Sequence, residues 1–123
     1  MSLALSLIFV FLTHYIADFL CQTREMANNK SSSVYWLTLH VLTYSIVTSI
    51  LWGVFLTQDF LILFLVWWTT FLTHWTTDFF TSKGTSYFYK KNNMFGFFST
   101  LGFDQFIHAS TLLLTYFYFI KHG

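Results

Sequence analysis

The chain has 123 residues, enough for one domain, and 55% of them are hydrophobic, 24% aromatic and only 9% charged. A soluble domain carries about 25% charged residues, so this composition favours a protein that faces lipid. The net charge of +1 provides no basic surface for nucleic acid. Cys21 is the single cysteine, which excludes an internal disulfide.

Four apolar segments are long enough to cross a membrane as helices, which takes about 20 residues. In chain order they are residues 2–22, 34–56, 59–80 and 102–120. The chain has no proline, so we expect largely continuous helices. The first segment lacks the basic start and small-residue cleavage site of a signal peptide, which indicates a retained helix. The predicted fold is an all-α membrane protein, with residues 1–123 forming one transmembrane domain, a four-helix bundle.

The linkers between these segments place most of the positive charge on one side. The basic residues of the first and third linkers are Arg24, Lys30, Lys83, Lys90 and Lys91, and only Lys121 belongs to the other side. Short loops rich in Lys and Arg face the cytoplasm. We therefore predict a multi-pass protein of the cytoplasmic (inner) membrane with both termini outside. The short linker "TQD" makes the second and third helices an antiparallel pair.

The two halves of the chain share a motif. Residues 11–19 read FLTHYIADF and residues 71–79 read FLTHWTTDF, with six of nine positions identical. Three pairs align: His14 with His74, Asp18 with Asp78 and, with about eight extra residues in the third linker, His40 with His108. Because two helices per half preserve orientation, we predict two parallel repeats, about residues 1–56 and 59–120.

The ionisable side chains of the spans fall in one layer near the predicted cytoplasmic ends. An i, i+4 spacing puts His and Asp on one helix face, and a charged group facing lipid is costly, so these side chains should point into the bundle. Imidazole and carboxylate groups together bind zinc, iron or manganese. We predict a divalent metal site, zinc first and iron or manganese as alternatives, with these ligands: His14, Asp18, His40, His74, Asp78, Asp104 and His108.

Seven ligands exceed the four of one tetrahedral zinc ion. They suit two ions, or one ion with additional carboxylates that orient the histidines. Two other interpretations use the same residues: a proton or cation pathway without a bound metal, and purely structural polar packing. Apart from Asp59 at the start of the third span, the outer halves of the spans carry no acidic or basic side chain, which argues against a path across the membrane.

Polar residues beside this layer are candidates for catalysis and substrate binding. Asp78 or Asp104 could serve as a general base, and Gln22 or Gln105 could bond a ligand, a substrate or a metal-bound water. Cys21 shares the face of His14, but its repeat partner is Thr81, so we interpret it as packing. Residues that could hold a phosphate group are Lys30, Ser31, Ser32, Thr81, Ser82 and Lys83. Cytoplasmic loops have this composition without any substrate as well.

Four stretches resemble a family of small bacterial and phage membrane proteins classed as domain of unknown function 3307. They are "HYIADFLCQTREMANNKSSS", "LTLHVLTY", "FLTHWTTDFFTSK" and "FFSTLGFDQFIHAS", and they include every predicted metal ligand. More distantly, the pattern is similar to predicted inner-membrane metal-dependent hydrolases, which also array His and Asp on short helices. That resemblance implies hydrolytic chemistry by analogy.

The sequence thus predicts a membrane-embedded metal-dependent hydrolase that acts from the cytoplasmic face. A bound metal would lower the pKa of a water molecule and polarise the bond to be cleaved. The position near the interface, with Lys and Ser nearby, favours a phosphoester or lipid-linked substrate. The sequence contains no G-x-S-x-G motif, so covalent catalysis by a serine is less favoured. The alternatives are a cation or proton transport protein and a non-enzymatic membrane component with a structural metal. Homo-oligomerisation is compatible with the sequence, although no G-x-x-x-G motif marks a contact face.

Overall fold

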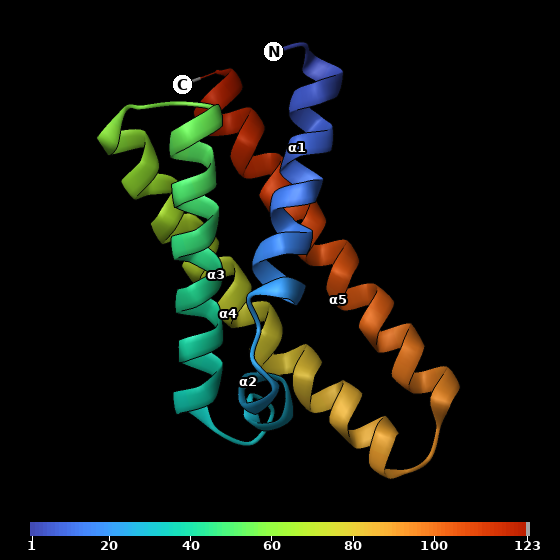
Figure 1. Cartoon of the computed structure of the whole chain (residues 1–123). Coiled ribbons are helices and arrows are strands. Elements are labelled where there is room, and N and C mark those ends of the chain that lie inside the picture. The colour runs from blue at the N-terminus through green and yellow to red at the C-terminus, as the bar shows by residue number, and fades with distance from the viewer. Residues whose placement is uncertain (123) are drawn as a thin grey trace.

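A computed structural model describes residues 1–122, and in that range the regular structure is helical (Figure 1). The elements are α1 (Leu3–Tyr15), a π-helical turn η1 (Ile16–Leu20), α2 (Arg24–Asn29), α3 (Val34–Phe55), α4 (Phe60–Lys90), α5 (Met94–Thr115) and a second π-helical turn η2 (Tyr116–Lys121). The two π-helical turns continue α1 and α5 directly, so four long helical segments make up most of the molecule.

Each helix begins at a side chain that caps its first turn. The capping residues are Ser2, Thr23, Ser33, Asp59 and Asn93. Their side-chain oxygens accept hydrogen bonds from backbone N–H groups that have no partner inside the helix. Between α4 and α5 the chain reverses at Asn92, whose φ of 56° is the left-handed conformation that asparagine tolerates. These local signals explain where the helices start and how the tight α4–α5 connection forms.

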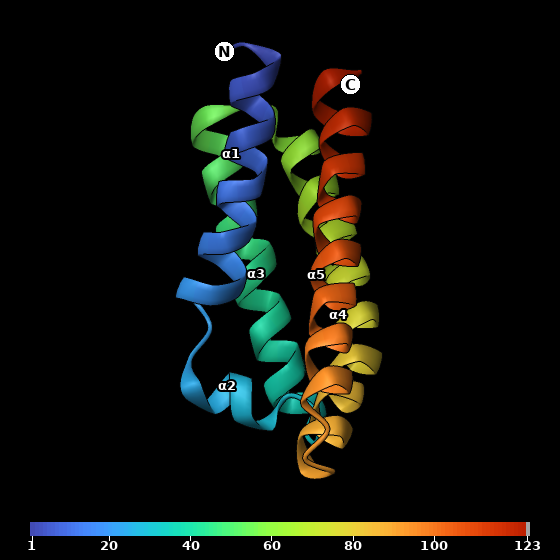
Figure 2. The same ribbon diagram turned by 90° about the vertical axis from the view of Figure 1, so that its right-hand side faces the viewer.

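Helix α4 packs extensively against both α5 and α3, and α1 packs less extensively against α5 and α3, so the four long segments form one bundle (Figure 2). Helices α1 and α4, which carry the two copies of the repeated motif, run in one direction, whereas α3 and α5 run in the other (Figure 1). The two termini and the α3–α4 turn lie at one end of the molecule, and α2 and the α4–α5 turn lie at the other. Both copies of the motif therefore reach the same depth of the bundle.

Several predicted boundaries differ from the structure. Helix α4 continues past residue 80 to Lys90 and α5 begins at Met94, so most of the predicted third linker is helical. The first linker contains α2. A polar composition ends a membrane span but does not end a helix, and no proline interrupts these residues. The first helix is also less regular than expected, because it changes to π-helical geometry at Ile16.

Three segments are long and apolar enough to cross a membrane: Leu3–Leu20, Val34–Phe55 and Phe60–Lys90. The fourth predicted span, residues 102–120, is not among them in the part of the chain that the structure describes. Helix α5 carries Asp104, Gln105 and His108, which lower its mean hydropathy. The fold is therefore all-α, with three candidate spans, and four transmembrane helices are not confirmed.

The polarity of the molecule is reversed relative to that of a water-soluble protein. More polar than apolar side chains are buried. Large apolar side chains lie outside, among them Phe60, Phe95 and Phe106, which are 87%, 85% and 66% exposed. The buried apolar side chains include one packed group, which we call the apolar cluster: Val10, Trp52, Val66, Leu112 and Tyr116. On every long helix, the residues of this cluster lie closer to the end of the molecule with the termini than the buried polar residues do.

Candidate metal centre

The seven predicted metal ligands are all buried, with side chains brought together from the four long segments. Helix α1 supplies His14, η1 supplies Asp18, α3 supplies His40, α4 supplies His74 and Asp78, and α5 supplies Asp104 and His108. Their relative exposure lies between 1% and 7%. Side chains that are distant in sequence therefore share one polar interior.

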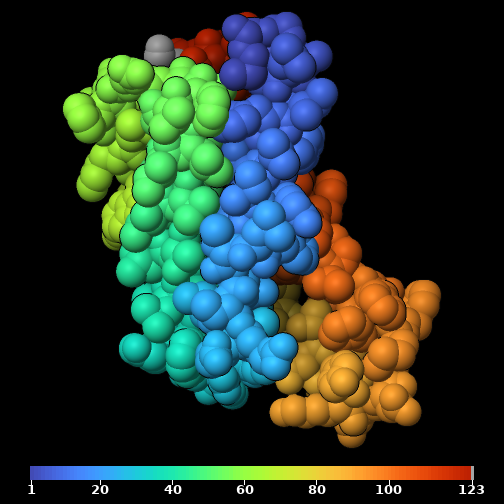
Figure 3. Space-filling model, viewed as in Figure 1, coloured from blue at the N-terminus to red at the C-terminus, as the bar shows by residue number. Residues whose placement is uncertain are grey.

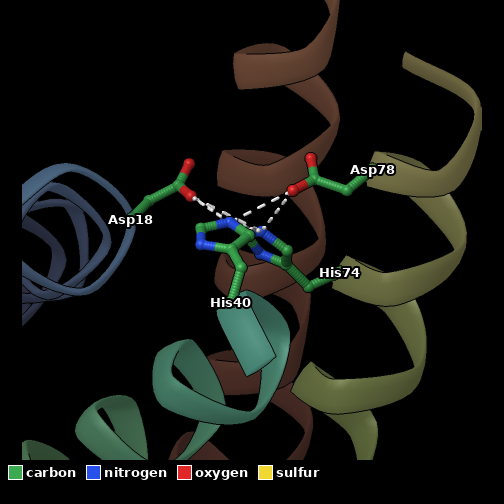
Figure 4. A group of neighbouring side chains, drawn as sticks. All are labelled: Asp18, His40, His74 and Asp78. Atoms are coloured by element: carbon green, nitrogen blue, oxygen red, sulfur yellow. Dashed lines mark hydrogen bonds and ion pairs between the residues drawn. The ribbon is translucent and has the colours of Figure 1, made fainter. Parts of the chain in front are cut away.

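Four of these residues form a compact group that we call the first cluster: Asp18, His40, His74 and Asp78 (Figure 4). The two imidazoles point toward each other, with Nε2 of His40 lying 3.2 Å from Nε2 of His74. Asp18 Oδ1 lies 3.1 Å from the first of these nitrogens and 3.5 Å from the second. Asp78 Oδ2 lies 3.1 Å and 3.2 Å from them. Two nitrogens and two oxygens thus converge on one point.

The spacing of these four atoms fits a tetrahedral metal ion. In a zinc site with metal–ligand distances of about 2.0–2.1 Å, neighbouring ligand atoms lie about 3.3 Å apart. The five distances among the four atoms given above run from 3.1 to 3.5 Å. Nδ1 of His40 and Nδ1 of His74 have no hydrogen-bond partner among the described residues. Each Nε2 lies beside carboxylate oxygens to which it can donate a proton, and in the tautomer with the proton on Nδ1 it offers a lone pair to a cation.

The charges of the site also favour a bound cation. Three buried carboxylates, Asp18, Asp78 and Asp104, lie close to one ammonium group, Lys30, whose Nζ is 3.2 Å from Asp78 Oδ2. With neutral imidazoles, three negative charges and one positive charge leave a net charge of −2. Uncompensated charge in a buried site is strongly unfavourable. One divalent ion would make the site neutral.

Lys30 lies outside the candidate spans, on the turn after α2, with a largely buried side chain. Burial acts to lower its pKa, but the carboxylates of Asp78, Asp18 and Asp104 outweigh burial and hold the pKa above its usual value. The ammonium group is therefore charged at neutral pH and provides a fixed positive charge beside the first cluster.

A second group, the second cluster, consists of Asp18, Asp104 and His108, whose ligand atoms lie within 4.8 Å of one another. Nε2 of His108 is 3.0 Å from Asp104 Oδ1 and 2.8 Å from Asp78 Oδ1. Asp104 also accepts a hydrogen bond from the hydroxyl of Thr81. The two clusters share Asp18, and Asp78 contacts both.

His14 borders the two clusters and belongs to neither. Its Nε2 is hydrogen-bonded to Gln105 Oε1 at 2.8 Å and lies 3.7 Å from Asp18 Oδ2. The corresponding pair in the second half, His74 and Asp78, is closer at 3.2 Å. The π-helical turn explains the difference, because its wider winding rotates Asp18 away from the position that a regular α-helix would give it.

Two other residues connect this network. Gln105 Nε2 donates to Asp104 Oδ2 at 2.9 Å and lies 3.5 Å from Asp18 Oδ2. Tyr44 was not predicted as part of the site; its hydroxyl lies 3.0 Å from His14 Nδ1, and its ring lies 4.0 Å from that of His74. Its position four residues after His40, on the same helix face, was the signal that could have revealed it.

A pocket of about 250 Å³ opens onto the clusters from the end that carries α2. Its polar lining residues are Gln22, Lys30, Asp78, Thr81, Ser82, Thr85 and Asp104. An adjoining pocket of about 520 Å³ shares Lys30 and Ser82 with it and adds Ser31. A hollow is visible there in Figure 3, between the residues around α2 and those of α4 and α5. Gln22 Oε1 is buried in this region with no hydrogen-bond partner among the described residues.

The predicted substrate-binding residues divide between two places. Lys30, Thr81 and Ser82 line the pocket beside the clusters. Lys83 instead lies over the ring of Phe79, 3.9 Å from its centroid, and lines a separate pocket with Ser31, Ser32, Ser86, Tyr87 and Lys90. Of the two predicted lysines, the structure thus places Lys30 beside the clusters, and Lys83 away from them.

These features define an all-helical protein with three candidate spans and buried His and Asp clusters that could hold a metal ion. Over residues 6–123 the chain matches the family described as "Protein of unknown function (DUF3307)". It belongs to that family. No curated protein and no solved structure matches the chain, so the more distant resemblance to inner-membrane hydrolases is not confirmed.

Proposed function

We propose that the protein is a metal-dependent hydrolase embedded in the cytoplasmic membrane, with its site at the cytoplasmic side and a phosphoester or lipid-linked substrate. The observation that carries this proposal is the contact between a convergent His and Asp cluster and a polar pocket that contains Lys30. Pockets with a few convergent polar groups and buried charges are the usual form of a catalytic site.

The membrane location rests on the distribution of polarity. Apolar side chains such as Phe60 and Phe95 face outward, while ionisable side chains face inward. Apolar patches of this extent are unfavourable in water and favourable in lipid. The end of the molecule that carries α2 and the α4–α5 turn holds Arg24, Lys30, Lys83, Lys90 and Lys91, which favours a cytoplasmic position for that end.

The residues around the pocket can be given roles in phosphoester hydrolysis. A divalent ion bound by the first cluster would supply Lewis-acid chemistry to the site. Asp104, which faces the pocket, is placed to accept a proton from water as the water oxygen adds to phosphorus and the phosphorus–oxygen ester bond breaks. The leaving alcohol oxygen takes up one proton. Lys30 and Ser82 line the same pocket and would hold the anionic oxygens of the substrate.

Hydrolysis assays on purified protein test this proposal. Metal-loaded wild-type protein should release phosphate from a phospholipid phosphomonoester or a polyprenyl phosphate, and Asp104→Asn should reduce the rate about 100-fold or more, the range expected for a general base. Thr48→Val, a change outside the pocket, serves as the matched control. Release no faster than that of a protein-free blank, at full metal loading, would contradict the proposal.

A structural metal is the second candidate function, and one observation favours it. The first cluster offers four protein ligands, and only Asp78 among them lines the pocket. Structural zinc sites are closed in this way, whereas catalytic sites keep an open position. A metal that stabilises the fold without any hydrolysis would support this alternative.

Cation transport is less compatible with the structure, because the tightly packed apolar cluster, including Trp52 and Val66, lies between the site and the end with the termini.

A further inference from the structure

We infer that the centre is dinuclear: a second divalent cation binds the second cluster, with Asp18 and Asp78 bridging the two ions. This inference rests on the metal centre of the proposed function but not on hydrolysis itself. The second ion is held by Asp104 and His108, of which Asp104 lines the pocket; with this ion bound, Asp104 acts as a ligand instead of the general base. Carboxylates that bridge two ions a few ångströms apart are common in helical bundles and in phosphoester-cleaving enzymes.

The two aspartates each direct one oxygen to either side. Asp78 Oδ2 faces His40 and His74 at 3.1 and 3.2 Å, whereas its Oδ1 faces His108 at 2.8 Å. Asp18 Oδ1 likewise faces His40 at 3.1 Å, whereas its Oδ2 lies 3.5 Å from the side-chain amide of Gln105 and 3.7 Å from His14 Nε2; Asp18 also has a carboxylate oxygen within 4.8 Å of ligand atoms of Asp104 and His108. An aspartate that ligates a single ion needs only one of its two oxygens close to the other ligands. Asp78 thus contacts histidines on both sides, and Asp18 lies within reach of both positions.

The ligands of the second cluster have a suitable spacing for an ion of their own. His108 Nε2 lies 3.0 Å from Asp104 Oδ1 and 2.8 Å from Asp78 Oδ1. Adjacent ligands of an octahedral ion with metal–oxygen distances of about 2.1 Å lie about 3 Å apart. The amide of Gln105 and the hydroxyl of Thr81 hold Asp104 in place. If His108 is neutral, this side has its own imidazole and carboxylate ligands. None of them is a residue that serves the first cluster alone.

The internal repeat explains why the two positions differ. The contact of Asp18 with His40 in the first half corresponds to that of Asp78 with His108 in the second. The first half has Trp36 at the position that corresponds to Asp104. The additional carboxylate therefore occurs on the second side only, and Asp104 lines the pocket together with the bridging Asp78, whereas Asp78 alone represents the first cluster there. The second position thus presents two of its ligands to the pocket and the first presents one.

Charge also identifies the substrate class. Three carboxylates and Lys30 leave a net charge of −2, and two divalent ions change it to +2. A phosphate monoester dianion would neutralise that charge, and the pocket of about 250 Å³ has room for a phosphate group. A neutral ester would leave the site positively charged. The dinuclear centre therefore favours a phosphomonoester over a carboxylic ester or an amide.

Counting bound Mn²⁺ in the full-length protein tests this inference. Wild-type protein dialysed against Mn²⁺ should retain about two ions per chain, and its electron paramagnetic resonance spectrum should show two exchange-coupled ions, since shared carboxylates couple neighbouring metals. Asp104→Asn and His108→Gln should each retain about one ion with an uncoupled spectrum. The matched control Asp59→Asn changes an aspartate far from the site and should keep both ions coupled.

One ion per wild-type chain, with the spectrum of an isolated Mn²⁺, would overturn the inference, and so would no bound Mn²⁺ at all. The spectrum of the wild type decides the matter even if both variants fail to fold. Two coupled ions without phosphate release would contradict the hydrolase proposal and leave the dinuclear centre in place. One uncoupled ion with phosphate release would contradict only the dinuclear centre.

Discussion

The same four helical segments build two interiors of opposite character. In the apolar cluster, Trp52 is fully buried and its ring meets that of Tyr116 edge to face at 6.2 Å. In the candidate metal centre, three carboxylates and four imidazoles are buried between the same helices. The first interior consists of packed apolar side chains. The second contains like charges that repel one another, so its stability depends on what it binds. The comparison predicts that mutations in the two regions have separable effects.

Asp78→Asn should have the largest effect on metal binding. The carboxylate contacts His40, His74 and His108, so its loss weakens both clusters. Bound metal should fall at least about tenfold, as observed when a ligand is removed from a metal site. Mass spectrometry of the purified variant gives the metal content. An unchanged metal content would show that the converging side chains do not form the metal site.

Trp52→Ala should produce the complementary result in the apolar cluster. Removing a fully buried aromatic ring leaves a cavity and costs about 3–5 kcal/mol of unfolding free energy. The folded fraction should keep its full metal content, because Trp52 lies away from both clusters. Unfolding in detergent solution and metal analysis of the folded fraction measure the two quantities. Loss of metal from folded Trp52→Ala protein would show that the two regions are not independent.

Chelation should lower stability without any change in sequence. A ligand that binds only the folded state contributes about 2.7 kcal/mol when its concentration is 100 times its dissociation constant. Removing metal with a chelator should therefore lower the melting temperature of wild type by about 8 °C or more, since 1 kcal/mol corresponds to about 3 °C or more for a chain of this size. The Asp78→Asn variant is the control and should show no such shift. Equal melting temperatures of metal-loaded and chelated wild type would contradict a metal-stabilised interior.

Lys30→Gln should have the smallest effect and should separate the pocket from the ligands. Lys30 contacts Asp78 but is not a ligand, so removal of its positive charge should leave metal content equal or slightly higher. Inorganic phosphate should bind about tenfold more weakly, the loss expected for one charge-assisted hydrogen bond. Lys83→Gln is the matched control, since Lys83 lies over Phe79 in a separate pocket. Equal phosphate binding by wild type and Lys30→Gln would remove Lys30 from the substrate site.

Much of the centre was predictable from sequence because it follows helical periodicity. The pairs His14 and Asp18, His74 and Asp78 recur at i, i+4, and charged groups in apolar helices have to face inward. All seven predicted ligands are indeed buried together. Helix length was less predictable, since residues 81–90 are polar enough to end a membrane span but remain helical in α4.

Other features depend on tertiary contacts that periodicity does not contain. The π-helical turn that carries Asp18 has no proline or glycine to announce it. The contact of Lys30 with Asp78 joins a turn to a helix 48 positions further along the chain. The division of the ligands into two clusters depends on which oxygen of each aspartate faces which histidine, and that is determined by the packing of four helices.

The most direct test of the account is the metal content of wild-type protein compared with two histidine variants. His74→Ala removes a ligand of the first cluster, whereas His122→Ala removes an exposed histidine outside it. Wild type and His122→Ala should each carry about one divalent ion per chain or more, and His74→Ala should carry markedly less. Less than about a tenth of an equivalent in wild-type protein that has been exposed to zinc, iron and manganese would contradict the central claim.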